Sequence, residues 1–175
     1  MNHFRVIRPG INSTFQDLGR KNLYHLGIPF SGAMDNRNYL LANAIAGNNE
    51  HKPVIEFAFQ GPLLKFKGEK INFNITGNVN FNIIKNKNKI EGMCYKNYIL
   101  EDGDELDILS TNKSVYGYLA ISGNLDVNYN WDSCSINTKA KIGANNGKKI
   151  EKDQFINISN PHSLNSNRKL NYLNS

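Results

Sequence analysis

Two stretches on either side of Gly77 alternate apolar residues with asparagine, and this period of two constrains the fold most strongly. Isoleucine and phenylalanine occupy every other position in residues 71–75, as do valine, phenylalanine and isoleucine in residues 79–83. Successive side chains of a β-strand point to opposite faces, so each stretch predicts a strand with an apolar face and an asparagine face. We expect the two strands to pair around Gly77, with the asparagines facing solvent or a cavity.

Other short apolar segments follow one another closely along the chain. They cover residues 4–7, 54–59, 63–66, 105–109 and 115–121. Turn signals such as Gly61-Pro62 and Gly68 separate several of them. Short strands at this spacing predict a mainly β, antiparallel fold in the form of a barrel or a sandwich.

One segment has the period of an α-helix, and we expect it to pack on this β structure. Asp35 is placed to cap its first turn, and Gly47 to end it in the left-handed conformation. Apolar residues recur between them at helical spacing: Leu40, Leu41, Ala44 and Ile45. The predicted fold class is therefore mainly β with one packed helix.

The length of 175 residues is that of one folding unit. We expect the folded domain to cover residues 1–158. From residue 159 to residue 175 the chain is polar, with Asn160-Pro161 near its start, which predicts a tail or the beginning of a linker.

The net charge of +6 invites a nucleic-acid-binding function, but the distribution of charge argues against one. Lys85, Lys87 and Lys89 alternate with asparagine at an expected hairpin tip, and residues 101–105 form a compensating acidic turn. We therefore expect a solvated surface and no nucleic-acid partner.

Other classes are disfavoured by spacing and hydropathy. Cys94 and Cys134 lie 40 positions apart, unlike a redox pair or a zinc ribbon, and the four histidines never have the i, i+4 spacing of a helical metal site. We expect reduced thiols and no metal. The longest apolar runs are short and the N-terminus has no apolar leader, so we expect no membrane segment and a cytoplasmic location.

The strongest candidate for chemistry is a dense polar stretch from Arg8 to Asp35. Residues 11–33 have no sustained periodicity, which predicts a long ordered loop. Arg20 offers a planar cation for a carboxylate or phosphate, and His25 can move a proton near neutral pH. Asp17 or Asp35 could orient the histidine or accept its proton.

Backbone N–H groups at Ser31, Gly32 and Ala33 precede the helix and form a natural anion or oxyanion site. The alternative is that the polar groups of this stretch satisfy the buried backbone of their own loop and one another. Both interpretations remain open from the residues alone.

Six segments in this order resemble the carboxyltransferase-domain family, which includes the C-type subunit of 5-oxoprolinase, part of urea carboxylase and the KipI antagonist. They are QDLGR (16–20), PFSGAMD (29–35), ANAIAGN (42–48), IEFAFQGPLLKF (55–66), ITGN (75–78) and YLAISGNLDV (118–127). The resemblance implies a cyclophilin-like β-barrel. Asn22 and Asn124 stand where the family usually has glycine, and the motifs of the family's second half are missing from this chain.

The polar stretch and the resemblance together give an expected site. Its catalytic residues would be His25, Asp17 and Arg20. Its substrate-binding residues would be Gln16, Ser31, Gly32, Asp35, Ser133 and Ser135, the last two from a partly retained Gly-Ser-x-Ser-Thr pattern.

The function implied by the resemblance is that of a C-type component of an ATP-dependent 5-oxoprolinase, a hydrolase. A B-type partner would share the ATP, and an A-type subunit would open the ring of the small lactam.

Two alternatives are kept. One is a biotin-dependent carboxyltransferase acting on urea or another amide, with biotin on a separate carrier because the chain has no Met-Lys dipeptide. The other is a non-catalytic binding module like the KipI antagonist.

Overall fold

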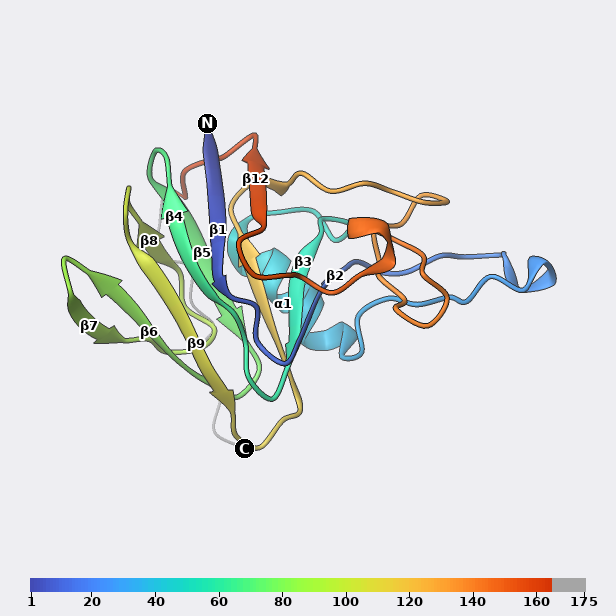
Figure 1. The fold of residues 1–175 in the computed structure, drawn as a ribbon, viewed down its shortest axis with the longest axis horizontal. Coiled ribbons are helices and arrows are strands. Elements are labelled where there is room, and N and C mark those ends of the chain that lie inside the picture. Colours follow the sequence, from blue (N-terminus) through green and yellow to red (C-terminus); the bar gives the residue numbers. More distant parts are fainter. Residues whose placement is uncertain (165–175) are drawn as a thin grey trace.

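The computed structural model describes residues 1–164 as two antiparallel sheets and one α-helix, α1 (Asn36–Ala46) (Figure 1). The seven-stranded sheet has the order β11 (Asn124–Leu125), β12 (Phe155–Ser159), β1 (Asn2–Arg8), β4 (Leu63–Lys67), β9 (Glu105–Thr111), β6 (Val79–Lys85) and β7 (Asn88–Glu91). The five-stranded sheet has the order β2 (Asn12–Gln16), β3 (Val54–Ala58), β10 (Tyr116–Ile121), β5 (Ile71–Thr76) and β8 (Tyr98–Leu100). The predicted fold class, mainly β with one packed helix, is confirmed.

The main core draws apolar side chains from both sheets. Phe4 and Phe66 meet edge to face with their ring centroids 5.7 Å apart, and Phe73 and Phe81 do the same at 6.3 Å. Phe73 lies on the five-stranded sheet and Phe81 on the seven-stranded sheet. The contact between these two rings therefore joins the inner faces of the two sheets.

Helix α1 packs on the outer face of the five-stranded sheet, against β10 and β5. Its Tyr39, Ala42 and Ala46 form a second small core with side chains of β10 and β3. Both predicted ends are confirmed: a carboxylate oxygen of Asp35 accepts the backbone N–H of Asn38 at 3.0 Å, and Gly47 has φ +72°.

The strands on either side of Gly77 do not pair with each other, so that prediction is wrong. β5 pairs with β10 and β8, whereas β6 pairs with β9 and β7, and Gly77 turns the chain from one sheet to the other. Asn74 is also fully buried, because its face of β5 lies under α1, where its amide donates to the carbonyl of Ala42 at 2.9 Å.

The expected loop over residues 11–33 is partly wrong as well. Its first part is β2, which pairs with β3 from Asn12 opposite Ala58 to Gln16 opposite Val54. Most residues of this strand are polar, so it has no alternating hydropathy pattern in the sequence. Backbone hydrogen bonds to β3 hold it in the sheet. The other strands missed from the sequence are β7, β8, β11 and β12.

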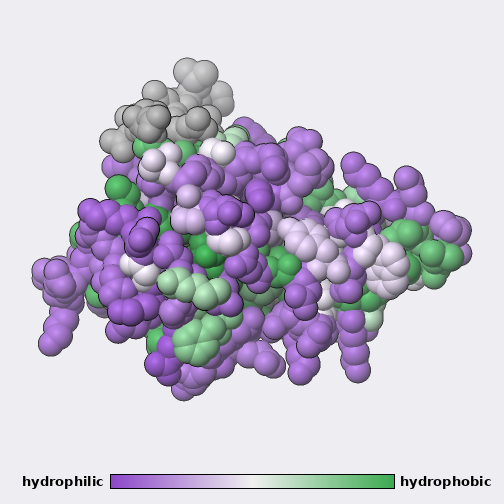
Figure 2. All heavy atoms as spheres, turned by 90° about the horizontal axis from the view of Figure 1, so that it is seen from above, coloured by the Kyte–Doolittle hydropathy of each residue, from purple (hydrophilic) through white to green (hydrophobic). Residues whose placement is uncertain are grey.

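Residues 17–33 then form an arm that projects from the sheets (Figure 1). Backbone hydrogen bonds close its base, from Arg20 N to Phe30 O at 2.7 Å and from Ala33 N to Asp17 O at 2.9 Å. A short 3-10 helix, η1 (Tyr24–Leu26), lies in the arm with all three residues exposed. Figure 2 shows hydrophobic residues at this end of the molecule.

The expected tail over residues 159–175 lies mostly outside the described residues, and the domain boundary stays a prediction. β12 carries the fold to Ser159. Within residues 1–164, no helix combines the length and the apolar character needed to cross a bilayer.

We predict that Asn74→Ala lowers the free energy of unfolding by about 1–2 kcal/mol, because a buried hydrogen bond to α1 is lost. Asn80→Ala is the matched control on β6, where the side chain is exposed, and should change it by less than about 0.5 kcal/mol. Urea unfolding measures both. Equal losses in the two variants would contradict the burial of Asn74 under the helix.

Candidate functional site

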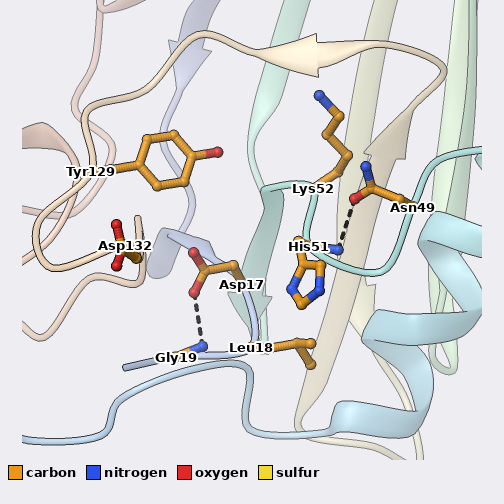
Figure 3. Close-up of a pocket in the computed structure, with 8 residues that line it drawn as sticks. All are labelled: Asp17, Leu18, Gly19, Asn49, His51, Lys52, Tyr129 and Asp132. Atoms are coloured by element: carbon orange, nitrogen blue, oxygen red, sulfur yellow. Dashed lines mark hydrogen bonds between the residues drawn. The ribbon is translucent and has the colours of Figure 1, made fainter. Parts of the chain in front are cut away.

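Three segments far apart in the sequence enclose a cleft of about 250 Å³. They are the turn after β2, the loop after α1, and the loop that follows β11 (Figure 3). The lining residues are Asp17, Leu18, Gly19, Asn49, His51, Lys52, Tyr129 and Asp132.

Asp17 is the most strongly held side chain of the cleft. One carboxylate oxygen accepts the hydroxyls of Ser133 and Ser135, each at 2.6 Å, and the N–H of Gly19 at 2.8 Å. The other oxygen accepts the backbone N–H of Cys134 at 2.7 Å. The carboxylate therefore ties the end of β2 to a loop more than a hundred residues further along the chain.

These hydrogen bonds also set the protonation of Asp17. Burial alone would raise the pKa of the carboxyl group, but donation from Ser133, Ser135 and the backbone N–H groups of Cys134 and Gly19 outweighs it. The pKa of Asp17 is held below its ordinary value, so the group is a carboxylate at neutral pH.

Arg20 braces the same loop from the other side. Its Nε donates to Asn130 O at 3.1 Å, its Nη1 to Ser135 O at 2.9 Å and its Nη2 to Ser133 O at 3.3 Å. The side chain is buried, and burial lowers its pKa although Asp17 and Cys134 oppose this shift. All three guanidinium nitrogens donate to backbone carbonyls. Arg20 therefore has a structural role, and its planar fork is not free to bind an anion.

The loop after α1 is fixed by the helix itself. The hydroxyl of Tyr39 donates to Glu50 O at 2.8 Å and to Lys52 O at 2.9 Å, and the amide of Asn43 reaches Lys52 O at 3.0 Å. Lys52 is half-buried and its ammonium donates to the side-chain oxygen of Asn124 at 3.2 Å. The helix thus places one cation at the cleft.

Tyr129 and Asp132 lie on the opposite side of the cleft from His51 and Lys52. The side chain of Asp17 lies between these two pairs (Figure 3). Burial, with Cys134 and Asp17 nearby, raises the pKa of Tyr129 to about 12. Its phenol is therefore protonated at neutral pH and can donate a hydrogen bond.

The cleft combines an ammonium group, an imidazole, a phenol and two carboxylates. Such a set can bind a small polar molecule that has both an anionic group and an amide. Within residues 1–164, no three histidine, cysteine or acidic side chains gather as metal ligands would.

The structure brings together five of the nine predicted site residues. Gln16, whose amide donates to Thr14 Oγ1 and Ile136 O, both at 3.0 Å, joins Asp17, Arg20, Ser133 and Ser135 at the junction between β2 and the loop of residues 130–136. Sequence reasoning took Gln16, Asp17 and Arg20 from the polar stretch, and Ser133 and Ser135 from the resemblance.

The other four predicted residues lie on the arm and at the start of α1. His25 is exposed in η1, while Ser31 and Gly32 lie at the base of the arm, where Gly32 approaches Leu18 and Gly19. The N–H of Ala33 is taken by Asp17 O. Asp35 caps α1, and its second carboxylate oxygen accepts the side-chain amide of Asn38 at 2.7 Å.

Sequence reasoning missed Glu56, a buried carboxylate on β3. It accepts the N–H of Met34 at 2.8 Å and the hydroxyl of Tyr118 at 2.9 Å. Burial raises the pKa of Glu56, although these two hydrogen bonds oppose the rise. A single acidic residue within the apolar strand VIEFA was the signal that could have found it.

Sequence reasoning also missed the cleft residues Asn49, His51, Lys52, Tyr129 and Asp132. The polar run NNEHK directly after the helix was a signal for the first three. Tyr129 and Asp132 carried none, because only the anchoring of their loop by Asp17 brings them to the cleft.

Comparison with known protein families gives one match that covers most of the chain. The family described as "Carboxyltransferase domain, subdomain A and B" matches residues 26–174.

Individual relatives agree with this match. The C-type 5-oxoprolinase subunit of Haemophilus influenzae is 31% identical over 154 residues, which are 88% of this chain and 48% of that protein. The urea amidolyase of Lachancea kluyveri is 33% identical over 159 residues, 90% of this chain and 8% of that protein. The chain thus spans less than half the length of either relative.

A solved structure agrees as well. The crystal structure of the K. lactis urea amidolyase superposes with a TM-score of 0.83 at 28% identity, over 91% of this chain and 9% of that one.

We predict that Asp17→Asn lowers the free energy of unfolding by about 2–4 kcal/mol at pH 7, because buried donors lose a charged acceptor. The pKa of Asp17 lies below that of an unfolded aspartate, about 3.9. Its contribution is therefore complete above that pH and is lost as the pH falls through the lower, folded pKa.

Urea unfolding from pH 7 to pH 2.5 should thus show the two proteins converging in acid. Asp153→Asn, at an exposed ion pair with Arg5, is the matched control and should cost less than about 1 kcal/mol. If the difference in unfolding free energy between the Asp17 variant and the parent stayed constant down to pH 2.5, the lowered pKa of Asp17 would be contradicted.

Proposed function

The chain belongs to the carboxyltransferase domain family, and from that premise we propose that it acts as a C-type component of an ATP-dependent 5-oxoprolinase. In this proposal a B-type partner supplies the rest of the enzyme that activates 5-oxoproline, and an A-type subunit opens the ring. In this proposal the assembled enzyme is the unit of activity.

One observation carries the proposal: the cleft has a cation at one side and a neutral donor with a carboxylate at the other. 5-Oxoproline has a carboxylate, a lactam carbonyl and a lactam N–H. Lys52 would bind the substrate carboxylate, Tyr129 would donate to the lactam oxygen, and Asp132 would accept from the lactam N–H. Donation from Tyr129 polarises the carbonyl, which weakens the amide resonance that protects the ring.

The predicted residues take defined roles in this proposal. Asp17 and Arg20, with Gln16, Ser133 and Ser135, hold the wall that carries Tyr129 and Asp132. His25, exposed on the arm, is the proton carrier that would act at the junction with the B-type partner. Ser31, Gly32 and Asp35 shape the base of the arm and the start of α1.

ATP itself does not fit the cleft. A nucleoside triphosphate carries several negative charges, whereas the cleft of about 250 Å³ sets the one ammonium group of Lys52 against the carboxylates of Asp17 and Asp132. We therefore assign the cleft to the lactam.

A second candidate function is carboxyl transfer to urea or another small amide, favoured by the 33% identity to a urea amidolyase. Urea offers the same carbonyl and N–H groups to Tyr129 and Asp132, and biotin would arrive on a separate carrier protein. Faster decarboxylation of a carboxybiotinylated carrier when the chain and urea are present would identify this chemistry.

We predict that Lys52→Gln raises the KM for 5-oxoproline by about tenfold or more in the assembled enzyme, with a smaller change in kcat, because a charged hydrogen bond is worth about 1.5–3 kcal/mol. Oxoproline-dependent ATP hydrolysis measures this after co-expression with B-type and A-type subunits. Lys113→Gln, in an exposed loop, is the control and should leave KM unchanged.

Three outcomes separate the candidate functions. Absence of oxoproline-dependent hydrolysis in the assembled parent enzyme would contradict the 5-oxoprolinase function. An unchanged KM in Lys52→Gln together with an unchanged kcat in Tyr129→Phe would remove the cleft from the chemistry. A stable complex with the B-type partner whose activity is indifferent to every cleft variant and to His25→Ala would favour the non-catalytic binding module.

A further inference from the structure

A second cavity, which the proposed function does not use, lies along the loop of residues 137–151. Its volume is about 400 Å³. We call it the lysine cavity, and its lining residues are Thr138, Lys141, Asn146, Gly147, Lys148, Lys149 and Glu151. Three of the seven are lysines, and one is acidic.

This loop concentrates the positive charge of the protein. Residues 137–151 contain four lysines and one glutamate, a net charge of +3 out of the +6 of the whole chain. Within residues 1–164, none of the three lining lysines forms an ion pair. By contrast, Lys67 and Lys70 lie 2.7 and 2.6 Å from carboxylate oxygens. The lysine cavity is therefore lined by three lysines that form no ion pair with a carboxylate within residues 1–164.

The backbone under the lysines is fixed by side-chain hydrogen bonds. The amide of Asn145 donates to Lys148 O at 3.3 Å and to Lys149 O at 2.8 Å. Gly147 has φ +70°, and a Cβ there would lie 2.3 Å from the carbonyl carbon of Lys141, so only glycine fits. The loop thus brings the stretch at Lys141 against the stretch at Lys148 and Lys149.

The loop is anchored to the wall of the candidate site as well. Ala144 N donates to Cys134 O at 2.9 Å, and Gly143 N donates to the side-chain oxygen of Asn130 at 3.0 Å. These hydrogen bonds fix the backbone of the loop. A ligand would therefore have to order only the lysine side chains, which lowers the entropic cost of binding.

We propose that the lysine cavity binds a polyphosphate anion, either inorganic or as the phosphate chain of a nucleotide. Three lysines line this one cavity, and a chain of phosphate groups offers oxygen atoms to each of them. A single phosphate carries at most about two charges and is small for this volume. The inference is independent of the proposed function, because it concerns a different cavity.

Isothermal titration calorimetry of the full chain with tripolyphosphate, ATP and orthophosphate tests this proposal. We expect tripolyphosphate to bind more tightly than orthophosphate, and the affinity to fall as salt is raised. The double variant Lys148→Gln/Lys149→Gln should weaken tripolyphosphate binding by about tenfold or more. ATP binding at least as tightly as tripolyphosphate would identify the nucleotide as the source, and weaker ATP binding would identify the inorganic anion.

The matched control is Lys87→Gln/Lys89→Gln, which removes the same charge from exposed positions next to the β6–β7 turn. It should change the affinity less than twofold. Equal weakening in both double variants would show attraction to net charge alone and would overturn the proposal. The absence of binding at millimolar tripolyphosphate would also overturn it. So would a single-stranded 20-mer DNA that binds as tightly as tripolyphosphate and whose affinity is unchanged by the Lys148/Lys149 substitutions.

Discussion

The carboxylate of Asp17 is the interaction on which the candidate site depends. It receives four hydrogen bonds, one from the turn that follows β2 and three from the loop of residues 133–135. Regular strand pairing covers little of the chain between β11 and β12, so this loop takes its position from such side-chain contacts. Without the carboxylate, the loop that carries Tyr129 and Asp132 would lose three of the hydrogen bonds that hold it at the cleft.

The polar groups at this junction form a hydrogen-bonded network around a buried charge. Asp17 accepts while Arg20 donates to carbonyls of the same loop, so the loop is held through its N–H and its C=O groups at once. A buried carboxylate is tolerable only with such donors, and losing one partner exposes the full desolvation penalty. In the proposed function, contact with the substrate is therefore left to the more exposed side chains that this frame presents, which are Lys52, Tyr129 and Asp132.

Local signals made much of the fold predictable. Asp35 and Gly47 marked the ends of the helix, and alternation marked most central strands, because caps and side-chain faces depend on near neighbours. β2 escaped because Asn12, Ser13 and Thr14 are polar, and the pairing of β5 was wrong because a strand pattern does not say which strand lies beside it. Asp17 and Arg20 were found from the polar stretch and the two serines through resemblance, whereas Lys52 and Tyr129 come together only through tertiary anchoring.

Amide hydrogen exchange at Gly19 and Cys134 tests the role of Asp17 most directly. Both N–H groups donate to its carboxylate, one from each segment that it joins. We predict that Asp17→Asn accelerates exchange at both amides together, by about tenfold or more relative to amides in the β6–β9 pair, whose protection reports global unfolding. Unchanged protection of Cys134 in the variant would show that the loop holds its place without Asp17 and would contradict the account.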